Sequence, residues 1–373
     1  MGSQGETART LGRAPSLTGI RALAIGMVIL VHTNISLAEG GWIGVDVFFV
    51  LSGFLITSLL LNEYEANGQF SIPKFYMRRI FRLVPAYWAF LLFVLVWAAV
   101  WRAGQFGSWG SEVVTSATYQ MNFFDISHFP QIGIGQTWSL AIEEQFYLVW
   151  PLLLLLGLKF TSRKVFMGLV VIGIVASFLA TVVMAHHGVS YRRLYYGLDT
   201  NALPLLVGCL AGFIYTGGYG KKIDPLLSAL IPLFTVGVLA LFLVGVPESS
   251  EWAYEGPVQL VCLLTAATLF SILLDANSWA AKILAHPWVV FVGLISYSLY
   301  LWNPFGMLVA RHLATGTAGR ALHLLVGLIL TFGFALASYY LVERLGLRLK
   351  DRFEVARGGS GASSLAGPTA HSL

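Results

Sequence analysis

The sequence predicts an all-α polytopic membrane protein of about ten transmembrane helices with both termini cytoplasmic. Hydrophobic residues make up 57% of the 373 positions and charged residues only 11%, whereas a soluble domain carries about a quarter charged residues. The mean hydropathy is +0.75. The apolar runs are about 18–22 residues long, which an α-helix needs to cross a hydrocarbon core of about 30 Å. The composition excludes a soluble globular protein.

The apolar runs divide the chain into predicted spans and connecting segments. A longer connection, 102–137, is aromatic and contains glycine, and we expect it on the membrane surface or dipping into it. Residues 1–16 and 354–373 are expected to be disordered cytoplasmic segments around a transmembrane domain at 17–353. The first run is expected to be a permanent span and not a cleaved signal. The predicted spans are 17–37, 43–62, 81–101, 138–158, 165–185, 201–218, 225–246, 258–275, 288–310 and 321–342.

Basic residues indicate the orientation, because cytoplasmic loops of membrane proteins carry an excess of Lys and Arg. With a cytoplasmic N-terminus, the outer loops hold few of the 23 basic residues, namely Arg102, Arg192, Arg193, Arg311 and Arg320. The pI of about 9.2 therefore reflects topology, and we expect no nucleic-acid partner. Cys209 and Cys262 fall within spans and are expected to pack as small apolar residues, without a disulfide.

Two polar residues lie in the first span, Arg21 and His32. Eleven residues at 100° each amount to about 1100°, roughly 20° past three turns, so both side chains share a helix face about 16 Å apart along the axis. A charge at mid-helix costs about 2.5–3.5 kcal/mol on insertion scales and needs a reason. The alternative makes Arg21 a snorkelling anchor and His32 a hydrogen-bonded packing residue.

Acidic residues in two later spans are predicted near His32. Glu143 and Glu144 begin the fourth span, at about the depth of His32. A carboxylate there would orient the imidazole and raise its basicity, as a general base requires. Asp46 begins the second span at a similar level, and Ser52 and Gly53 further along it are interpreted as packing residues. The alternatives are an interfacial patch for the glutamates and a helix-end charge for Asp46.

Two arginines begin the third span on one helix face. Arg79 and Arg82 are three residues apart and follow Lys74 and Arg78, so their side chains are neighbours on a helix. Guanidinium groups bind phosphate bidentately, which makes the pair a candidate phosphate site. A topological role for the same residues is the alternative reading.

Together these segments resemble the membrane-bound acyltransferase-3 family. Arg21 and His32 match its arginine–ten residues–histidine motif, and Arg79 and Arg82 match its RxxR motif. The order and spacing agree from about residue 15 to 350. The other matching segments are Trp138-Ser139-Leu140 through Glu143-Glu144-Gln145-Phe146-Tyr147, Gly293 through Ser296-Tyr297-Ser298-Leu299-Tyr300-Leu301-Trp302, and Ser338-Tyr339-Tyr340-Leu341-Val342-Glu343-Arg344.

The resemblance implies an O-acyltransferase in a cell membrane of the bacterial inner or plasma type. It would move an acyl group, usually acetyl, from cytoplasmic acyl-CoA to a hydroxyl of a sugar-containing or glycosylated acceptor. Acetyl-CoA would be a co-substrate, with no permanently bound cofactor and no metal. His32 would be the base or the acyl carrier, with Glu143 or Glu144 orienting it. Arg21, Arg79 and Arg82 would hold CoA, and the acceptor side would contain Asp46, Asp199, Asn201, Tyr297 and Asn303.

The chain departs from the family pattern at two places. Asn303 follows Trp302 where the family usually has histidine, and Asn201 ends an Asp199-Thr200-Asn201 segment where many members have Asp-Thr-Arg. Both departures bear on acceptor contacts more than on the first-span pair. The hydrolase-like second domain of some O-antigen acetyltransferases is not expected.

Two other classes of protein remain open. Buried Arg, His, Asp and Glu also build proton and substrate pathways, so a proton-coupled transporter of a small polar solute is the main alternative. A structural scaffold, in which polar side chains only join helices, is the third. Consumption of acyl-CoA by the purified protein distinguishes the acyltransferase from both.

The predicted orientation is tested with a reporter that is active only in the cytoplasm, fused to the C-terminus. We expect a signal, because the basic loops assign both termini to the cytoplasmic side. A reporter active only outside serves as the matched control and should stay silent. The opposite pair of results would contradict the even number of spans.

Overall fold

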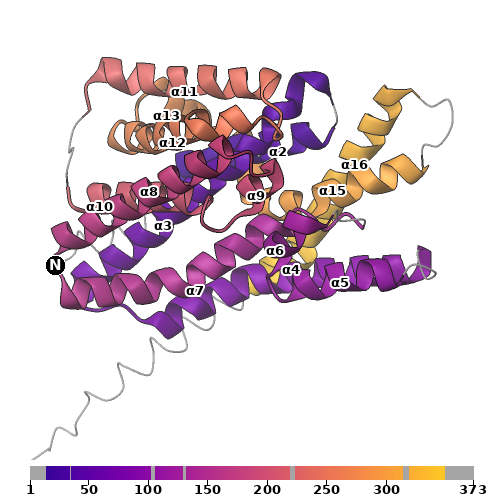
Figure 1. Ribbon diagram of the computed structural model, residues 1–373, viewed down its shortest axis with the longest axis horizontal. Coiled ribbons are helices and arrows are strands. Elements are labelled where there is room, and N and C mark those ends of the chain that lie inside the picture. Colours follow the sequence, from indigo (N-terminus) through magenta and orange to yellow (C-terminus); the bar gives the residue numbers. More distant parts are fainter. Residues whose placement is uncertain are drawn as a thin grey trace, which may run out of the picture.

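The computed structural model describes residues 14–33, 35–101, 106–128, 132–218, 223–313 and 319–348. Within those ranges all regular elements are helices. Figure 1 shows the long helices running side by side, with α11, α12 and α13 stacked on one side of the bundle and α4, α5 and α7 on the other. The all-α fold predicted from the sequence is confirmed.

The helices follow one another with short connections. The first part of the chain contains α2 (Pro15–His32), the 3₁₀ helix η1 (Ser36–Ile43), α3 (Gly44–Asn67), α4 (Ile72–Trp101), α5 (Phe106–Ala117), α6 (Met121–Ser127), α7 (Thr137–Phe160) and α8 (Arg163–His186). The second part contains α9 (Tyr191–Tyr196), α10 (Ala202–Thr216), α11 (Pro225–Gly245), the 3₁₀ helix η3 (Glu251–Glu255), α12 (Pro257–Leu274), α13 (Trp279–Leu284), α14 (Pro287–Leu294), α15 (Ser296–Leu313), α16 (Arg320–Ser338) and the π-helix η4 (Tyr339–Glu343).

Each predicted span corresponds to a helical element. Among the described residues, eight helices are long and apolar enough to cross a membrane, and the bent pair α14 and α15 makes a ninth if it counts as one span. The predicted span 201–218 is α10, an apolar helix of only 15 residues. The predicted surface segment 102–137 contains α5 and α6 in its described part.

The predicted terminal segments fall mostly outside the described residues. Helix α2 begins at Pro15, so the predicted segment 1–16 overlaps the helix by two residues. Residues 1–13 and 349–373 are not described. The cytoplasmic placement of both termini remains a prediction.

Glycines bring the helices at the centre of the bundle together. A Cβ added to Gly53 of α3 would overlap the backbone of Leu205 in α10, and one on Gly208 of α10 would overlap the backbone of Val50 in α3. Gly293 of α14 meets the backbone of Thr18 in α2 in the same way. Small residues are common at such crossings because lipid supplies no hydrophobic force between helices, so close van der Waals contact must do so. The interpretation of Gly53 as a packing residue is confirmed.

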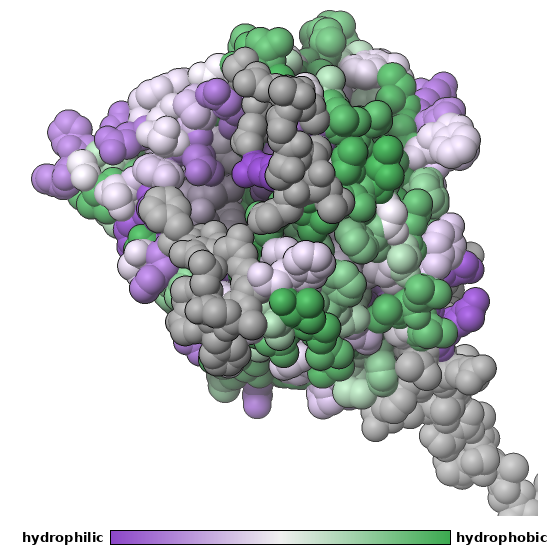
Figure 2. All heavy atoms as spheres, turned by 90° about the vertical axis from the view of Figure 1, so that its right-hand side faces the viewer, coloured by the Kyte–Doolittle hydropathy of each residue, from purple (hydrophilic) through white to green (hydrophobic). Residues whose placement is uncertain are grey.

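The outside of the bundle is apolar. Side chains of α8 and α11, such as Ile172 (64% exposed) and Leu241 (74%), point away from the protein. Figure 2 shows one end of the molecule, where apolar residues continue over one flank and hydrophilic residues gather on another. An exterior of this kind is suited to lipid and not to water.

Helix α15 departs from a regular straight helix at two points in its first half. It meets α14 at an angle of 66°, and Pro304 lies inside it. Proline lacks the N–H that would bond to the carbonyl oxygen four residues earlier, and here that residue is Tyr300. The turn from Tyr300 to Pro304 therefore lacks one of the hydrogen bonds of a regular helix.

Helix α6 carries a buried carboxylate outside the spans. Asp125 is fully buried, and Arg192, next to the start of α9, donates hydrogen bonds to the backbone carbonyls of Asp125 and His128. Burial raises the pKa of Asp125 from 3.8 to about 8, which the charge of Arg192 only partly opposes. Ordering α6 therefore requires the Asp125 carboxyl to remain largely protonated at neutral pH.

Replacing Asp125 with Asn should stabilise the purified protein, and more so at high pH. Between about pH 4 and 8 the unfolded carboxyl is ionised while the folded one keeps its proton, so the free energy of unfolding falls as pH rises through this window. Asp125→Asn removes that loss, and we expect a thermal midpoint higher by roughly 3–6 °C at pH 8 and a smaller gain at pH 5. Equal gains at the two pH values would show that this titration is not the cause.

Candidate functional site

Three arginines from two separate sequence motifs meet in one cavity. The cavity has a volume of about 80 Å³ and is lined by residues of α2, α3, α4, α7 and α15. We call it the arginine cavity; among its walls are Arg21, Arg79, Arg82, Ser52, Glu143, Tyr147, Ser296 and Tyr297. The structure brings together all three residues that the sequence assigned to acyl-CoA.

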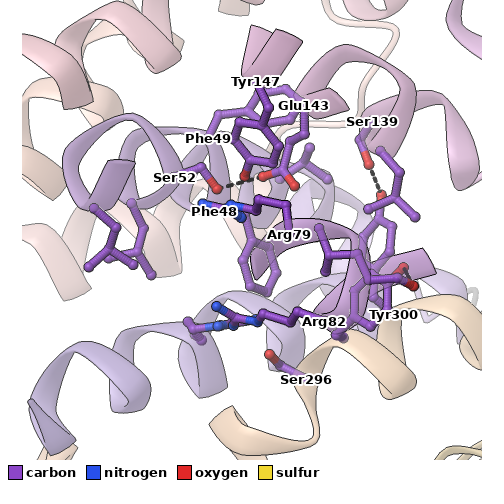
Figure 3. Close-up of a pocket in the computed structure, with 17 residues that line it drawn as sticks. Phe48, Phe49, Ser52, Arg79, Arg82, Ser139, Glu143, Tyr147, Ser296 and Tyr300 are labelled. Atoms are coloured by element: carbon purple, nitrogen blue, oxygen red, sulfur yellow. Dashed lines mark hydrogen bonds between the residues drawn. The ribbon is translucent and has the colours of Figure 1, made fainter. Parts of the chain in front are cut away.

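The arginine cavity is ordered by contacts between α3, α4 and α7. Ser52 Oγ donates a hydrogen bond of 2.6 Å to Glu143 Oε1. The Arg79 guanidinium carbon lies 4.2 Å from the centre of the Tyr147 ring, a cation–π contact. Figure 3 shows Arg79 directed toward Ser52 and Glu143, with Arg82 beside Ser296. The two guanidinium groups thus line different parts of the same cavity.

The cavity carries a positive charge. Its walls include three guanidinium groups and the single carboxylate of Glu143, and no described carboxylate lies within 4.0 Å of any of the three arginines. Glu343 of η4, which accepts a hydrogen bond from Ser298 at 2.9 Å, acts on Arg21 and Arg82 from a greater distance. A cavity in which three guanidiniums outnumber the carboxylates is suited to an anion.

His32 lines a second and larger cavity of about 600 Å³, which we call the histidine cavity. His32 Nδ1 lies 2.7 Å from the carbonyl oxygen of Val28, one turn earlier in α2. A carbonyl only accepts hydrogen bonds, so Nδ1 carries the hydrogen of the neutral ring and Nε2 keeps the lone pair. The hydrogen bond to the backbone of α2 thus leaves Nε2 of His32 without a hydrogen.

Asn303 is the side chain that contacts His32. Its Nδ2 lies 3.3 Å from the Val28 carbonyl and 3.2 Å from His32 Nδ1, and its side chain is fully buried. The amide therefore shares the acceptor that orients the imidazole. The family departure at this position thus lies directly beside the candidate reactive residue.

Aromatic side chains form much of the histidine cavity. Trp42, Trp138, Tyr195 and Tyr196 all line it, and the Trp138 and Tyr195 rings lie 4.6 Å apart. Two acidic residues, Glu39 and Glu248, and the exposed Arg311 add polar groups. In the loop before η3, burial raises the pKa of Glu248 and Arg192 opposes the rise. The cavity therefore offers apolar ring faces next to a few polar groups.

A third, lateral cleft of about 1200 Å³ holds other predicted residues. Glu144 and Gln145 of α7 line it, together with the ion pair of Arg193 and Asp199, whose bonds are 2.8 Å long. Burial alone would raise the pKa of Asp199, but the hydrogen bond and charge of Arg193 lower it. Within the described residues, no group of three or more His, Cys, Asp or Glu is placed to hold a metal ion.

The expected contact of the glutamates with His32 is corrected by the structure. Glu143 lines the arginine cavity and Glu144 the lateral cleft, so neither shares the cavity of His32. Adjacent residues on a helix point about 100° apart, which separates the two carboxylates. Glu143 instead faces guanidiniums, because a buried carboxylate is stable only near positive charge or hydrogen-bond donors.

Three of the predicted acceptor residues also lie elsewhere. Asp46 is buried near Tyr254 and Cys262 and lines none of the three cavities. Asn201 is buried and donates to the carbonyls of Tyr195 and Gly197, so it holds the turn before α10. Asp199 lines the lateral cleft and not the histidine cavity. Depth along a span did not predict the direction in which these side chains point.

Tyr297 lies with the three arginines and not with His32. It lines the arginine cavity, and its hydroxyl donates to the carbonyl of Leu83 at 3.1 Å. Its role in acceptor binding stays a prediction, and the structure places it in the cavity of the three arginines.

Sequence reasoning missed three residues that organise the site. Ser52 was interpreted as packing but bonds to Glu143. Glu343 and Tyr300 both lie in segments that carry the family resemblance, yet no role was assigned to either. For Glu343 the available signal was a carboxylate directly after the predicted span 321–342, where a charge close to the hydrocarbon requires a partner.

Comparisons with known proteins identify the family of the chain. An acyltransferase domain family matches residues 15–340. The peptidoglycan O-acetyltransferase OatA of Listeria monocytogenes is 34% identical over 302 residues, covering 78% of this chain and 48% of that protein. The O-acetyltransferase OatA of Staphylococcus aureus is 33% identical over 346 residues, covering 88% and 56%. A putative O-acetyltransferase of Staphylococcus aureus is 33% identical over 303 residues, covering 78% and 50%.

The chain spans about half the length of the curated relatives it matches. No solved structure matches it. The family model covers nearly all of the described helices, including both the arginine and the histidine cavities. The chain is a multi-pass bacterial membrane protein and belongs to the acyltransferase domain family.

Proposed function

We propose that this chain is an integral-membrane O-acyltransferase that moves an acetyl group from acetyl-CoA to a hydroxyl of a carbohydrate. One observation carries the proposal: α2 places Arg21 in an anion-binding cavity and His32 in a separate cavity with a free imidazole nitrogen. One helix therefore joins a site suited to a charged donor and a site suited to hydroxyl activation.

The donor would bind at the arginine cavity through its phosphates. At about 80 Å³ the cavity is smaller than the roughly 300–1,000 Å³ typical of ligand pockets, so only part of acetyl-CoA would enter it. Arg79 and Arg82 would hold phosphate oxygens, and Arg21 lies one step further along the path toward α2. The rest of the nucleotide would remain at the cavity mouth.

His32 would carry out the transfer on the other side. In direct transfer, Nε2 takes the proton of the acceptor hydroxyl while the hydroxyl oxygen attacks the thioester carbon. The carbon–sulfur bond breaks, and the CoA thiolate then takes up a proton. In the alternative, Nε2 itself attacks the thioester carbon, the carbon–sulfur bond breaks and the CoA thiolate leaves, which gives an acyl-histidine. The acceptor hydroxyl then attacks the acyl carbon, the bond from Nε2 to that carbon breaks, and the hydroxyl proton passes to the thiolate. Both routes use the nitrogen left free by the hydrogen bond of Nδ1 to Val28.

The histidine cavity supports a carbohydrate acceptor. Its aromatic rings, among them Trp42 and Trp138, provide rigid apolar faces with polar edges, a surface that suits the C–H face of a sugar. The printed name of one relative, a peptidoglycan O-acetyltransferase, makes glycan fragments of the cell wall the first acceptors to examine. Asn303 would then position His32 rather than bind the sugar.

The deciding experiment uses the purified protein in lipid nanodiscs with acetyl-labelled acetyl-CoA and cell-wall glycan fragments. Transfer of label to the glycan, with release of CoA, supports the proposal. Gradient-driven uptake of a polar solute into proteoliposomes, without CoA release, would instead favour the transporter. An acetyl donor other than CoA that is consumed in its place would overturn the donor assignment while leaving the acceptor assignment intact.

His32→Ala should abolish transfer, because no other described imidazole lines the histidine cavity. General acid–base catalysis contributes about 10²–10⁴-fold, and we expect a loss of that order in kcat with normal membrane insertion. His286→Ala, a change of an exposed histidine, is the control and should retain full activity. Turnover by the His32 variant at the wild-type rate would contradict the mechanism.

Replacing both Arg79 and Arg82 with Gln should raise the KM for acetyl-CoA more than the KM for the acceptor. Hydrogen bonds to charged groups contribute about 1.5–3 kcal/mol each, so we expect a rise of at least about tenfold for the donor. Arg78→Gln is the matched control, because Arg78 pairs with Glu63 at 3.0 Å and does not line the cavity. Equal changes in both KM values would argue against phosphate binding.

A further inference from the structure

Two residues belong to the walls of both cavities. Val45 of α3 and Tyr300 of α15 line the arginine cavity and also the histidine cavity. Both are largely buried, at 5% and 7% exposure. The two cavities are therefore neighbours separated at this point by an isopropyl group and a phenol ring.

Hydrogen bonds hold the Tyr300 ring in place. Its hydroxyl lies 2.5 Å from Ser139 Oγ and donates to the carbonyl of Gln136 at 3.1 Å. Figure 3 shows this link between α15 and α7 at the edge of the arginine cavity. Phe48 packs edge-on against the same ring, with 6.2 Å between centroids. Neighbours on α3 and α7 thus fix the ring across the boundary.

The backbone around Tyr300 is suited to movement. Pro304 has no N–H for the carbonyl of Tyr300, and the 66° break between α14 and α15 lies just before Ser296. The turn from Tyr300 to Pro304 therefore lacks one helical hydrogen bond, while the hydroxyl bonds restrain the side chain. Sites that open and close combine local backbone freedom of this kind with a small set of breakable contacts.

We propose that Tyr300, facing Val45, is a gate between the two cavities, closed by its hydrogen bond to Ser139. This rests on the proposed function, because a thioester held by the arginines must pass this boundary for its acyl group to reach His32. Opening requires the Tyr300 hydroxyl to leave Ser139 and Gln136 so that the ring can turn aside. When closed, the gate keeps water in the histidine cavity away from the thioester. Tyr300 is a positioning residue and takes no part in bond making.

The gate is tested by cysteine accessibility, which needs neither donor nor acceptor. Leu140→Cys places a thiol in the arginine cavity and Val31→Cys one in the histidine cavity. The native Cys209 and Cys262 are fully buried, so the unmodified chain should not react and is the background. A membrane-impermeant methanethiosulfonate reagent is added to one side of proteoliposomes at a time. The side from which Val31→Cys reacts is then the side on which the histidine cavity opens.

From that side, Leu140→Cys should react slowly when Tyr300 is intact. Tyr300→Ala should speed its labelling by about tenfold or more, because labelling follows the population of the open state. Tyr300→Phe keeps the ring but loses the hydroxyl bonds, and should give a smaller increase of about threefold. Tyr87→Phe is the matched control: it removes another buried hydroxyl bond, to the Ser116 carbonyl at 2.8 Å, and should leave the rate unchanged.

The outcomes separate the gate from the proposed function. Equal labelling of Leu140→Cys in all Tyr300 variants would overturn the gate, even if transfer of acetyl groups is observed. Faster labelling of Leu140→Cys in the Tyr300 variants, without any acetyl transfer by the unmodified protein, would support the gate and contradict the proposed acyltransferase function. Labelling of Val31→Cys at its normal rate shows that each variant is folded, and if Tyr300→Ala fails this check, Tyr300→Phe decides. In an active enzyme, Tyr300→Ala should also raise acetyl-CoA hydrolysis relative to transfer.

Discussion

The cost of placing charge in a hydrocarbon interior organises this protein. Arg21, Arg79, Arg82 and Glu143 all lie in membrane-spanning helices, where each charge alone would oppose insertion. The bundle turns them inward to one cavity, where opposite charges and hydroxyl donors lie close together. The arginine cavity follows from this constraint, and the apolar exterior follows from the same hydrocarbon surroundings.

The same constraint separates the two halves of the site. The charged groups of the arginine cavity lie within the spanning helices, whereas the histidine cavity contains an imidazole and aromatic rings, with Glu39, Glu248 and Arg311 contributed by loops and helix ends. A neutral His32 needs only a backbone acceptor and an amide neighbour, which Val28 and Asn303 supply. The imidazole therefore requires no carboxylate, and Glu143 is available to balance the arginines. This division accounts for the absence of a Glu–His pair from the described site.

Much of the fold follows from composition and periodicity. Each apolar run of spanning length corresponds to a helical element of the structure. Helical geometry predicted that Arg21 and His32 share one side of α2. The RxxR spacing correctly placed Arg79 and Arg82 side by side, and both line one cavity with Arg21. These features depend on neighbours within one helix, for which residue spacing determines position.

The partners between helices were decided only by the tertiary structure. Depth along a span suggested that Glu143, Glu144 and Asp46 approach His32, but the rotation of each helix about its axis sends them to different surroundings. That rotation is set by close contacts such as Gly53 against α10, which no local pattern specifies. The sequence alone thus determined the membrane class, the helices and the arginine–histidine pair of α2. The tertiary structure decided that the pair serves two cavities with Tyr300 between them, because only packing brings α3, α7 and α15 against α2.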